Sequence, residues 1–238
     1  MKIEVWSDFV CPFCYIGKRR LEQALESFPH HEDVEVVFRS FELDPNAKTE
    51  TPFSIHEIIA QKYRISVEEA KRANADIGRQ AEAVGLMLRF ETMKPTNTFD
   101  AHRLAQYAKE KGKLDEVVER LFYAYFTESK RISDRDVLLA LAESVGLDRQ
   151  ETEAVLAGGR YAEQVRKEEA IAAQLGIRGV PFFMLNGKYA ISGAQPVEVF
   201  RQALEKIWTE EQQSSSLQSL AEEGKTCTDG NCSIDERS

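Results

Sequence analysis

The chain has 238 residues, of which 42% are hydrophobic and 30% are charged, a composition typical of one globular domain or of one domain carrying a sizeable insertion. Its 31 basic and 40 acidic side chains give a formal net charge of −9, which argues against broad electrostatic binding to nucleic-acid phosphates or anionic lipid. No apolar run approaches the roughly 18 residues that cross a bilayer. The N-terminal stretch MKIEVWSDF carries acidic residues where a signal peptide has its apolar core, so we expect a cytoplasmic protein with no membrane association.

The N-terminal segment has the pattern of a strand, a helix and a second strand. Residues 2–6 alternate in polarity as a short strand does, and helical spacing follows from about Pro12 to Phe28. Pro29 cannot continue that helix. The stretch VEVVFRSF (34–41) is rich in β-branched and aromatic residues, as in a second strand. This order predicts one βαβ unit with parallel strands.

The middle of the chain is almost entirely helical in pattern. Between about Thr51 and Gly176 we count about six amphipathic helices. Ser66 stands three residues before Glu69 and predicts a capping box at the start of one of them. We expect this region to form a separate helical unit.

Strand character returns near the C-terminal end. PFFMLNGKYAISG (181–193) predicts a β-hairpin, with Asn186 and Gly187 in a two-residue turn. A last amphipathic helix carries Phe200 and Leu204 on its apolar side.

The order of these elements predicts an α/β protein with a thioredoxin-like fold and an inserted all-helical domain. We expect residues 1–50 and 160–208 to form the core and 51–159 to form the insertion. We expect the polar residues 209–238 to form a flexible tail.

Four cysteines occur, as two widely separated pairs: Cys11 with Cys14, and Cys227 with Cys232. They are too few for a disulfide scaffold in a chain of this size. Pairs of this kind indicate redox catalysis or metal binding before structural bridges.

Cys11 and Cys14 lie where a strand turns into a helix. The first turn of a helix presents free backbone N–H groups and the positive end of the peptide dipoles, which stabilise a thiolate. Cys11 takes that position, Pro12 fits the first helical turn, and Cys14 lies close enough to attack a mixed disulfide at Cys11. Coincidence, half of a zinc site and two buried apolar side chains are the competing interpretations. The strand–helix context favours redox function.

A second candidate element is GIRGVPFFML (176–185). Pro181 stands at the start of a predicted buried strand. Proline lacks the N–H that a strand interior needs, so it is tolerated only at such an end. A cis bond between Val180 and Pro181 would turn the chain towards the cysteines and leave the Val180 backbone for an extended substrate. An ordinary trans proline opening a strand is an equal alternative on spacing alone.

Three stretches together resemble the DsbA family of thiol-disulfide oxidoreductases: DFVCPFC, GVPFF and the helical block between them. SDFVCPFCYIGKRRLE and NTFDAHRLAQYAKEKG resemble its FrnE-like branch, and the resemblance covers residues 2–208. It implies that Cys11 is the attacking thiol, Cys14 the resolving thiol and Pro181 a cis-proline facing them. We expect Pro12, Phe13, Val180 and Pro181 to contact substrate.

The resemblance implies protein or peptide thiols and disulfides as partners, together with a redox partner such as glutathione or another thiol. It implies no cofactor beyond a redox-active disulfide, no metal, and a monomer or homodimer. Class kappa glutathione transferases and 2-hydroxychromene-2-carboxylate isomerases share this superfamily, and glutathione-dependent chemistry of that type is the alternative function. They typically carry serine at the first motif position, where this chain has Cys11. A redox-controlled, chaperone-like binding module is a further alternative.

The segment NTFDAHRL (97–104) opens a helix of the insertion. One interpretation is that a substrate cleft is lined by Asn97, Thr98 and His102. In the favoured interpretation, Asn97 or Thr98 caps the helix and His102 is partly buried. Three other histidines have no recognisable partners and are interpreted as surface residues: His30, His31 and His56.

The tail carries CTDGNC, in which a turn at Asp229-Gly230 brings Cys227 and Cys232 within reach of a disulfide. An auxiliary redox pair that exchanges with Cys11–Cys14 is the preferred interpretation, supported by a similar pair in some FrnE-like proteins. Exposed thiols without a role and a zinc site built from all four cysteines are the alternatives.

Overall fold

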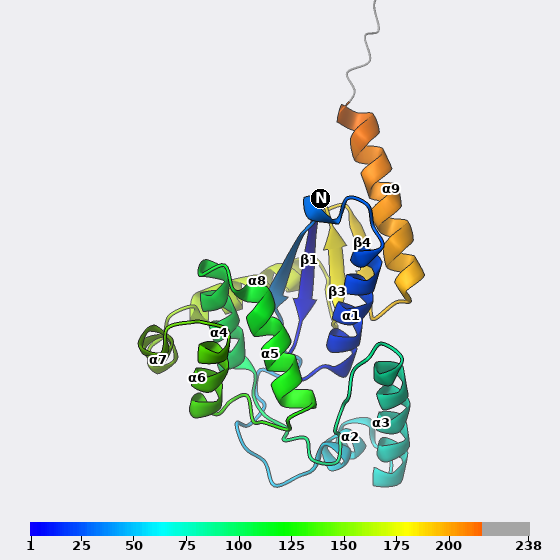
Figure 1. Cartoon of the computed structure of the whole chain (residues 1–238). Coiled ribbons are helices and arrows are strands. Elements are labelled where there is room, and N and C mark those ends of the chain that lie inside the picture. Colours follow the sequence, from blue (N-terminus) through cyan, green and yellow to red (C-terminus); the bar gives the residue numbers. More distant parts are fainter. Residues whose placement is uncertain (216–238) are drawn as a thin grey trace, which may run out of the picture.

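The computed structural model describes residues 1–215 of the chain. Within that range four strands form one mixed sheet in the order β2-β1-β3-β4 (Figure 1). The strands span Lys2–Ser7 (β1), Glu35–Ser40 (β2), Phe182–Leu185 (β3) and Tyr189–Ser192 (β4). β1 pairs in parallel with β2, as the strand–helix–strand pattern predicts, and β3 pairs antiparallel with β1 and β4.

Apolar side chains leave β1 on both sides of the sheet, because successive residues of a strand point to opposite faces. Ile3 and Val5 belong to the larger core, whereas Trp6 belongs to a smaller cluster with Ala172 and Ile177 on the other face. The helices that cover the two faces are α1 (Pro12–Glu26) and α9 (Val197–Ser215) on the first, and α8 (Ala162–Gln174) on the second. A short 3-10 helix, η1 (His31–Asp33), leads into β2.

Six further helices lie between β2 and α8 in the part of the chain that the structure describes. They are α2 (Ile55–Tyr63), α3 (Val67–Glu82), α4 (Phe99–Glu110), α5 (Leu114–Phe126), α6 (Arg135–Ser144) and α7 (Arg149–Ala157). With α8, the described region between Thr51 and Gly176 holds seven helices, one more than predicted. The capping box of Ser66 with Glu69 is confirmed. The fold is a thioredoxin fold with a helical insertion.

The predicted hairpin between β3 and β4 is confirmed, and Asn186 and Gly187 form its turn, in which the Lys188 N–H donates to the Leu185 carbonyl at 3.0 Å. The pairing register differs from the prediction by one residue. Leu185 pairs with Tyr189, so three residues connect the strands instead of two. This register places Ile191 opposite Phe183, and both side chains are buried in the larger core. A two-residue connection would turn Ile191 to the other face, because a one-residue shift reverses every side chain of a strand.

Aromatic stacking and ion pairs hold the insertion to α1. The ring of Tyr15 on α1 stacks on Phe122 of α5, with centroids 4.9 Å apart. The Tyr15 hydroxyl and the Lys18 ammonium both donate to Glu119 of α5, each at 2.7 Å. Burial raises the pKa of Glu119, but the Lys18 charge and these hydrogen bonds outweigh it and lower the pKa overall. The contacts fix α5 beside the helix that begins with the cysteine motif.

Glu168 of α8 links three elements from a buried position. Its carboxylate accepts the Ser40 N–H at 2.7 Å, the Gln106 amide at 2.6 Å and the Arg39 guanidinium at 2.7 Å. Burial raises the pKa of Glu168, yet the Ser40 and Arg39 hydrogen bonds outweigh burial and the net shift is downward. The charged form therefore stabilises the junction of β2, α4 and α8.

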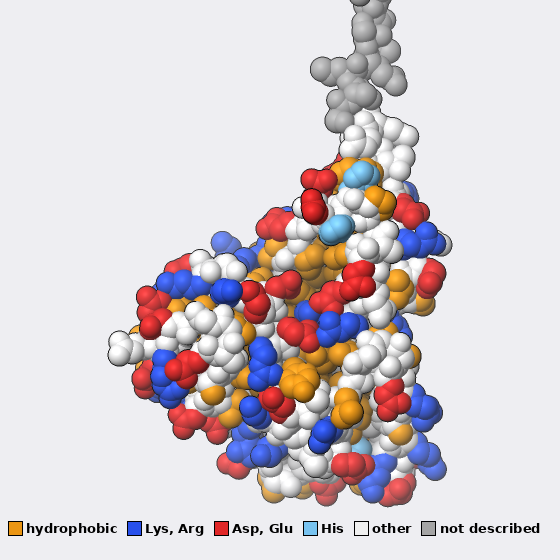
Figure 2. All heavy atoms as spheres, viewed as in Figure 1, with side chains coloured by type: hydrophobic (Ala, Val, Ile, Leu, Met, Phe, Trp, Pro, Cys, Tyr) orange, Lys and Arg blue, Asp and Glu red, His pale blue; other side chains and the backbone are white. Residues whose placement is uncertain are grey.

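Among residues 1–215, no helix is both long and apolar enough to cross a membrane. On the face shown in Figure 2, acidic and basic side chains are interspersed, with apolar side chains exposed between them.

Replacing Glu168 by glutamine removes the charge that these donors satisfy. We expect Glu168→Gln to lower the free energy of unfolding at neutral pH by about 1–3 kcal/mol. Because the folded-state pKa lies below the unfolded value of about 4.3, the stabilisation is present above that pH and is lost as the pH falls through the folded-state pKa.

Urea unfolding of the wild type and of Glu168→Gln at neutral and at strongly acidic pH measures this effect. The difference in unfolding free energy shrinks towards acidic pH if the ionised network is responsible. Glu82→Gln, at an exposed position of α3, is the matched control. A pH-independent difference for Glu168→Gln would contradict the assignment.

Candidate active site

Cys11 caps the N-terminus of α1. It has extended backbone angles, Pro12 occupies the first helical turn, and that turn contains no acidic residue. The Cys14 N–H donates to the Cys11 carbonyl at 3.0 Å, as the first hydrogen bond of the motif. The predicted position of Cys11 at a helix N-terminus is confirmed. Partial positive charge of the free N–H groups therefore acts on its sulfur.

The two thiols are free and have different surroundings. Cys11 is 5% exposed and Cys14 is 2% exposed, while Phe13 between them is 37% exposed. Burial raises the pKa of Cys14, and a hydrogen bond and the charge of Cys11 raise it further. The Ser7 hydroxyl and the Asp8 backbone N–H act in the opposite direction but do not outweigh burial. Cys14 therefore holds its proton more tightly than an exposed thiol does.

The structure brings the segment before β3 against Cys11. The Val180–Pro181 peptide bond is cis, and Pro181 is buried. The Cys11 thiol donates to the Val180 carbonyl with a sulfur-to-oxygen distance of 3.5 Å. Cys11, Cys14, Val180 and Pro181 thus lie in one place. The sequence indicates this set only through the resemblance, because 169 residues separate Cys11 from Val180.

Gly17 is a site residue that the sequence analysis missed. A Cβ atom at this position would lie 3.1 Å from Pro181 Cγ and 3.1 Å from Phe183 Cζ. The missing side chain lets α1 approach Pro181 closely. The signal in the sequence is a glycine inside a predicted helix. Glycine lowers helix stability, so its presence there indicates that another element packs closely against the helix.

The insertion reaches the active site through His102. Asn97 Oδ1 accepts the Phe99 N–H at 2.8 Å from the position before the N-cap residue Thr98, so it satisfies one free N–H at the start of α4. Thr98 forms no side-chain cap, and its carbonyl accepts the His102 N–H at 2.9 Å. His102 is 2% exposed and faces Asp8, with 3.5 Å between His102 Nε2 and Asp8 Oδ1. It is fully buried instead of partly buried.

The interpretation of His56 as a surface residue is wrong. Its side chain is 5% exposed, and its ring nitrogens contact Asn74 at 2.9 Å and Glu91 at 3.2 Å. These partners come from α3 and from the loop before α4, so the sequence around His56 does not indicate them. His30 and His31 are exposed, as predicted.

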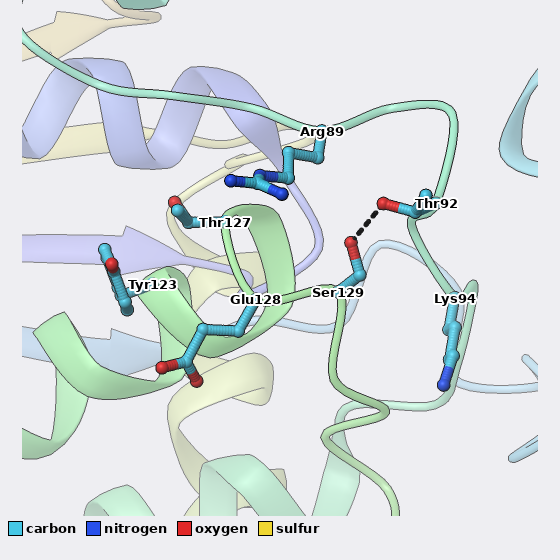
Figure 3. A pocket seen from close by; sticks show the side chains of 7 residues that line it. All are labelled: Arg89, Thr92, Lys94, Tyr123, Thr127, Glu128 and Ser129. Atoms are coloured by element: carbon cyan, nitrogen blue, oxygen red, sulfur yellow. Dashed lines mark hydrogen bonds between the residues drawn. The ribbon is translucent and has the colours of Figure 1, made fainter.

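A pocket of about 520 Å³ opens beside the end of α5, and neither thiol lines it (Figure 3). The Arg89 N–H donates to the Phe126 carbonyl at 2.8 Å, which joins the loop before α4 to α5. Thr92 and Ser129 form a hydrogen bond of 2.6 Å across the pocket. The lining residues are Arg89, Thr92, Lys94, Tyr123, Thr127, Glu128 and Ser129.

Within the described range, no group of three or more His, Cys, Asp or Glu side chains has an arrangement suited to a metal ion. Cys227 and Cys232 lie outside the described residues, so the auxiliary pair and the four-cysteine zinc site stay predictions.

Comparison with known proteins agrees with this geometry. The model of the DSBA-like thioredoxin domain matches residues 2–205. This chain belongs to the DSBA-like thioredoxin domain family. The uncharacterized protein YwbO of Bacillus subtilis is 32% identical over 204 residues, which cover 85% of this chain and 94% of that protein.

Solved structures show the same DSBA-like fold. A probable DsbA oxidoreductase from Streptomyces coelicolor is 40% identical, with a TM-score of 0.84 over 99% of this chain and 100% of that one. A 2-hydroxychromene-2-carboxylate isomerase is 17% identical, with a TM-score of 0.69 over 91% of this chain and 100% of that one. At that identity the isomerase shows a shared fold alone.

The close approach of Gly17 to Pro181 gives a direct test of the site's packing. We expect Gly17→Ala to displace the Pro181 ring and to slow thiol exchange severalfold. Gly78→Ala in α3 is the matched control, because its Cβ meets nothing within 4 Å. This control should raise the free energy of unfolding by about 0.5–1 kcal/mol.

Urea unfolding and insulin-reduction rates of both variants make the comparison. The prediction fails if Gly17→Ala gains as much stability as Gly78→Ala and reduces insulin at the wild-type rate. The close approach of α1 to Pro181 would then be unimportant for thiol exchange.

Proposed function

We propose that this protein is a thiol-disulfide oxidoreductase that exchanges disulfides with protein or peptide substrates through Cys11 and Cys14. Family membership supports oxidoreductase activity of the DSBA-like type. The observation that carries the dithiol assignment is the asymmetry of the two thiols. Cys11 stands at the N-terminus of α1, and Cys14 is buried one turn further with its pKa raised.

In the reducing direction, the Cys11 thiolate attacks one sulfur of a substrate disulfide. A bond forms between Cys11 and that sulfur, and the other substrate sulfur leaves as a thiolate. Cys14 then loses its proton and attacks Cys11, which releases the second substrate thiolate and leaves the Cys11–Cys14 disulfide. In the oxidising direction, a substrate thiolate attacks the Cys11–Cys14 bond at Cys11 and the same steps run backwards.

Extended polypeptide is the substrate that the surroundings of Cys11 favour. The Val180 carbonyl lies 3.5 Å from the Cys11 sulfur and marks where substrate backbone passes. Phe13, 37% exposed, and Leu43, 39% exposed, supply apolar surface near the motif. In this proposal Pro12 and Phe13 contact the substrate from one side and Val180 and Pro181 from the other.

The narrower assignments form part of the same proposal. The FrnE-like branch, action in the cytoplasm, and glutathione or another thiol as the electron partner rest on the sequence resemblance and the cysteine pattern. The role of Cys227 and Cys232 as an auxiliary redox pair rests on their spacing in the tail.

Serine substitutions test the two thiol roles separately. We expect Cys11→Ser to abolish insulin reduction, because the nucleophile is lost. Cys14→Ser should accumulate mixed disulfides with substrate, because nothing resolves them. Insulin turbidity and non-reducing electrophoresis measure these outcomes. Full reduction by either variant would refute the dithiol mechanism, and turnover of a glutathione-dependent isomerase substrate with Cys14 dispensable would favour the alternative chemistry.

A redox titration tests the direction of electron flow. We expect differential thiol labelling in defined redox buffers to show Cys11–Cys14 as one two-electron couple. A midpoint below the cytosolic glutathione poise, about −220 to −320 mV, identifies a reductant, and a higher midpoint identifies an oxidant. The Cys227→Ser/Cys232→Ser variant, labelled in parallel, shows whether the tail titrates separately. Four thiols protected by one bound zinc would refute the proposal.

A further inference from the structure

The pocket at the end of α5 lies beside the first turns of the helix that begins with the cysteine motif. Phe126, the last residue of α5, has its ring centroid 6.1 Å from that of Tyr15, which directly follows Cys14 in the sequence. Arg89 lines the pocket, and its N–H donates to the Phe126 carbonyl at 2.8 Å. An extended chain advances about 3.3 Å per residue. The pocket is therefore within reach of substrate residues that flank an exchanging cysteine.

Hydrogen bonds between its two walls fix the shape of the pocket. One wall is the loop before α4, and the other is the segment that follows α5 (Figure 3). The Thr127 hydroxyl donates to the Met87 carbonyl at 2.8 Å, and the Thr92 and Ser129 hydroxyls share a hydrogen bond of 2.6 Å. The volume of about 520 Å³ is typical of ligand pockets, which hold about 300–1,000 Å³. The pocket thus has its shape before any ligand binds.

Two cations of the pocket have no acidic partner. Among residues 1–215, the Arg89 guanidinium and the Lys94 ammonium form no hydrogen bond, ion pair or ring contact. The Arg89 side chain points towards Thr127, across the opening between the walls (Figure 3). An unpaired guanidinium in a preformed pocket is available to a ligand, and its planar N–H groups match the geometry of a carboxylate.

The acidic side chains of these two walls have other partners. Glu128 forms ion pairs with Lys130 at 3.0 Å and Arg120 at 3.3 Å, and its carboxylate points away from the guanidinium in Figure 3. Glu91 contacts the His56 ring at 3.2 Å. The uncompensated charge of the pocket is therefore positive, although the chain as a whole carries a formal net charge of −9.

The end of α5 does not cancel this positive charge. Free carbonyl groups at a helix C-terminus carry partial negative charge. The carbonyls of Tyr123, Ala124 and Phe126 each accept a backbone N–H, at 2.9, 2.8 and 2.8 Å respectively. These hydrogen bonds reduce the negative charge that an anion meets at this end of the helix.

We propose that the pocket binds carboxylate side chains of an acidic peptide segment that flanks the exchanging cysteine of the substrate. This inference rests on the proposed dithiol function and names the class of polypeptide on which it acts. Arg89 and Lys94 bind the carboxylates, and the Tyr123 ring, 41% exposed, contacts the aliphatic part of a glutamate side chain. Because the rest of the chain is acidic on average, the pocket determines where such a segment binds.

Twin peptides that differ only in charge test the assignment. Both contain the same disulfide, flanked in one by glutamates and in the other by glutamines. The reduced full-length protein is mixed with each peptide, and the second-order rate of reduction is measured by acid quenching and chromatography. We expect the wild type to prefer the glutamate peptide, and the preference to shrink with added salt, because salt screens exposed charges.

The variant Arg89→Gln/Lys94→Gln removes both cations. We expect it to reduce the glutamate peptide about 2- to 30-fold more slowly, as for two exposed charge contacts, and the glutamine peptide less than about twofold more slowly. Arg201→Gln/Lys206→Gln is the matched control. It changes the net charge equally on α9, which Figure 1 shows on the far side of α1 from α5.

Three results would overturn the inference while reduction itself persists. They are a wild type without preference for the glutamate peptide, a pocket variant that keeps the preference, and a control variant that loses it equally. The last result would assign the preference to net charge instead of to the pocket. A wild type that reduces neither peptide refutes the proposed dithiol function itself, and the inference with it.

Discussion

The arrangement of the site depends on the turn at Asp8, where the chain leaves β1 and enters α1. The carbonyl of Asp8 accepts the Cys11 N–H, and its carboxylate accepts the N–H of Leu43 from the loop after β2. The remaining carboxylate oxygen faces His102 of α4. Three separate parts of the chain therefore meet at one residue. Because these contacts hold the turn from several sides, the motif begins α1 in a defined position against the sheet.

The difference between the two thiols follows from that turn. Cys11 occupies the cap, where N–H groups of the first helical turn are free, whereas Cys14 points into the core beside Ser7 and Asp8. Burial stabilises the neutral form of a thiol, and a helix N-terminus stabilises the charged form. A single strand-to-helix junction thereby gives two identical side chains different surroundings. This difference in surroundings matches the proposed mechanism, in which Cys11 attacks the substrate and Cys14 resolves the mixed disulfide.

The helical insertion contacts the elements around the cysteine motif as well as covering the core. It packs on α1 through the stack of Phe122 on Tyr15 and through the ion pair of Glu119 with Lys18. It also delivers His102 into the core beside Asp8. The insertion and the cysteine motif form one physical unit even though the sequence separates them.

The sequence by itself determined the α/β order, the helical insertion and the place of Cys11 at a helix N-terminus, because capping residues, proline and side-chain periodicity are local signals. Only the tertiary structure decided which distant residues meet. The contacts of Cys11 with Val180, Gly17 with Pro181, and Asp8 with His102 depend on how helices pack over the sheet. The register of the hairpin was decided in the same way, because pairing Leu185 with Tyr189 buries Ile191 beside Phe183 while Asn186 and Gly187 still form the turn. Local patterns encode elements, whereas close packing of the core selects the partners of each side chain.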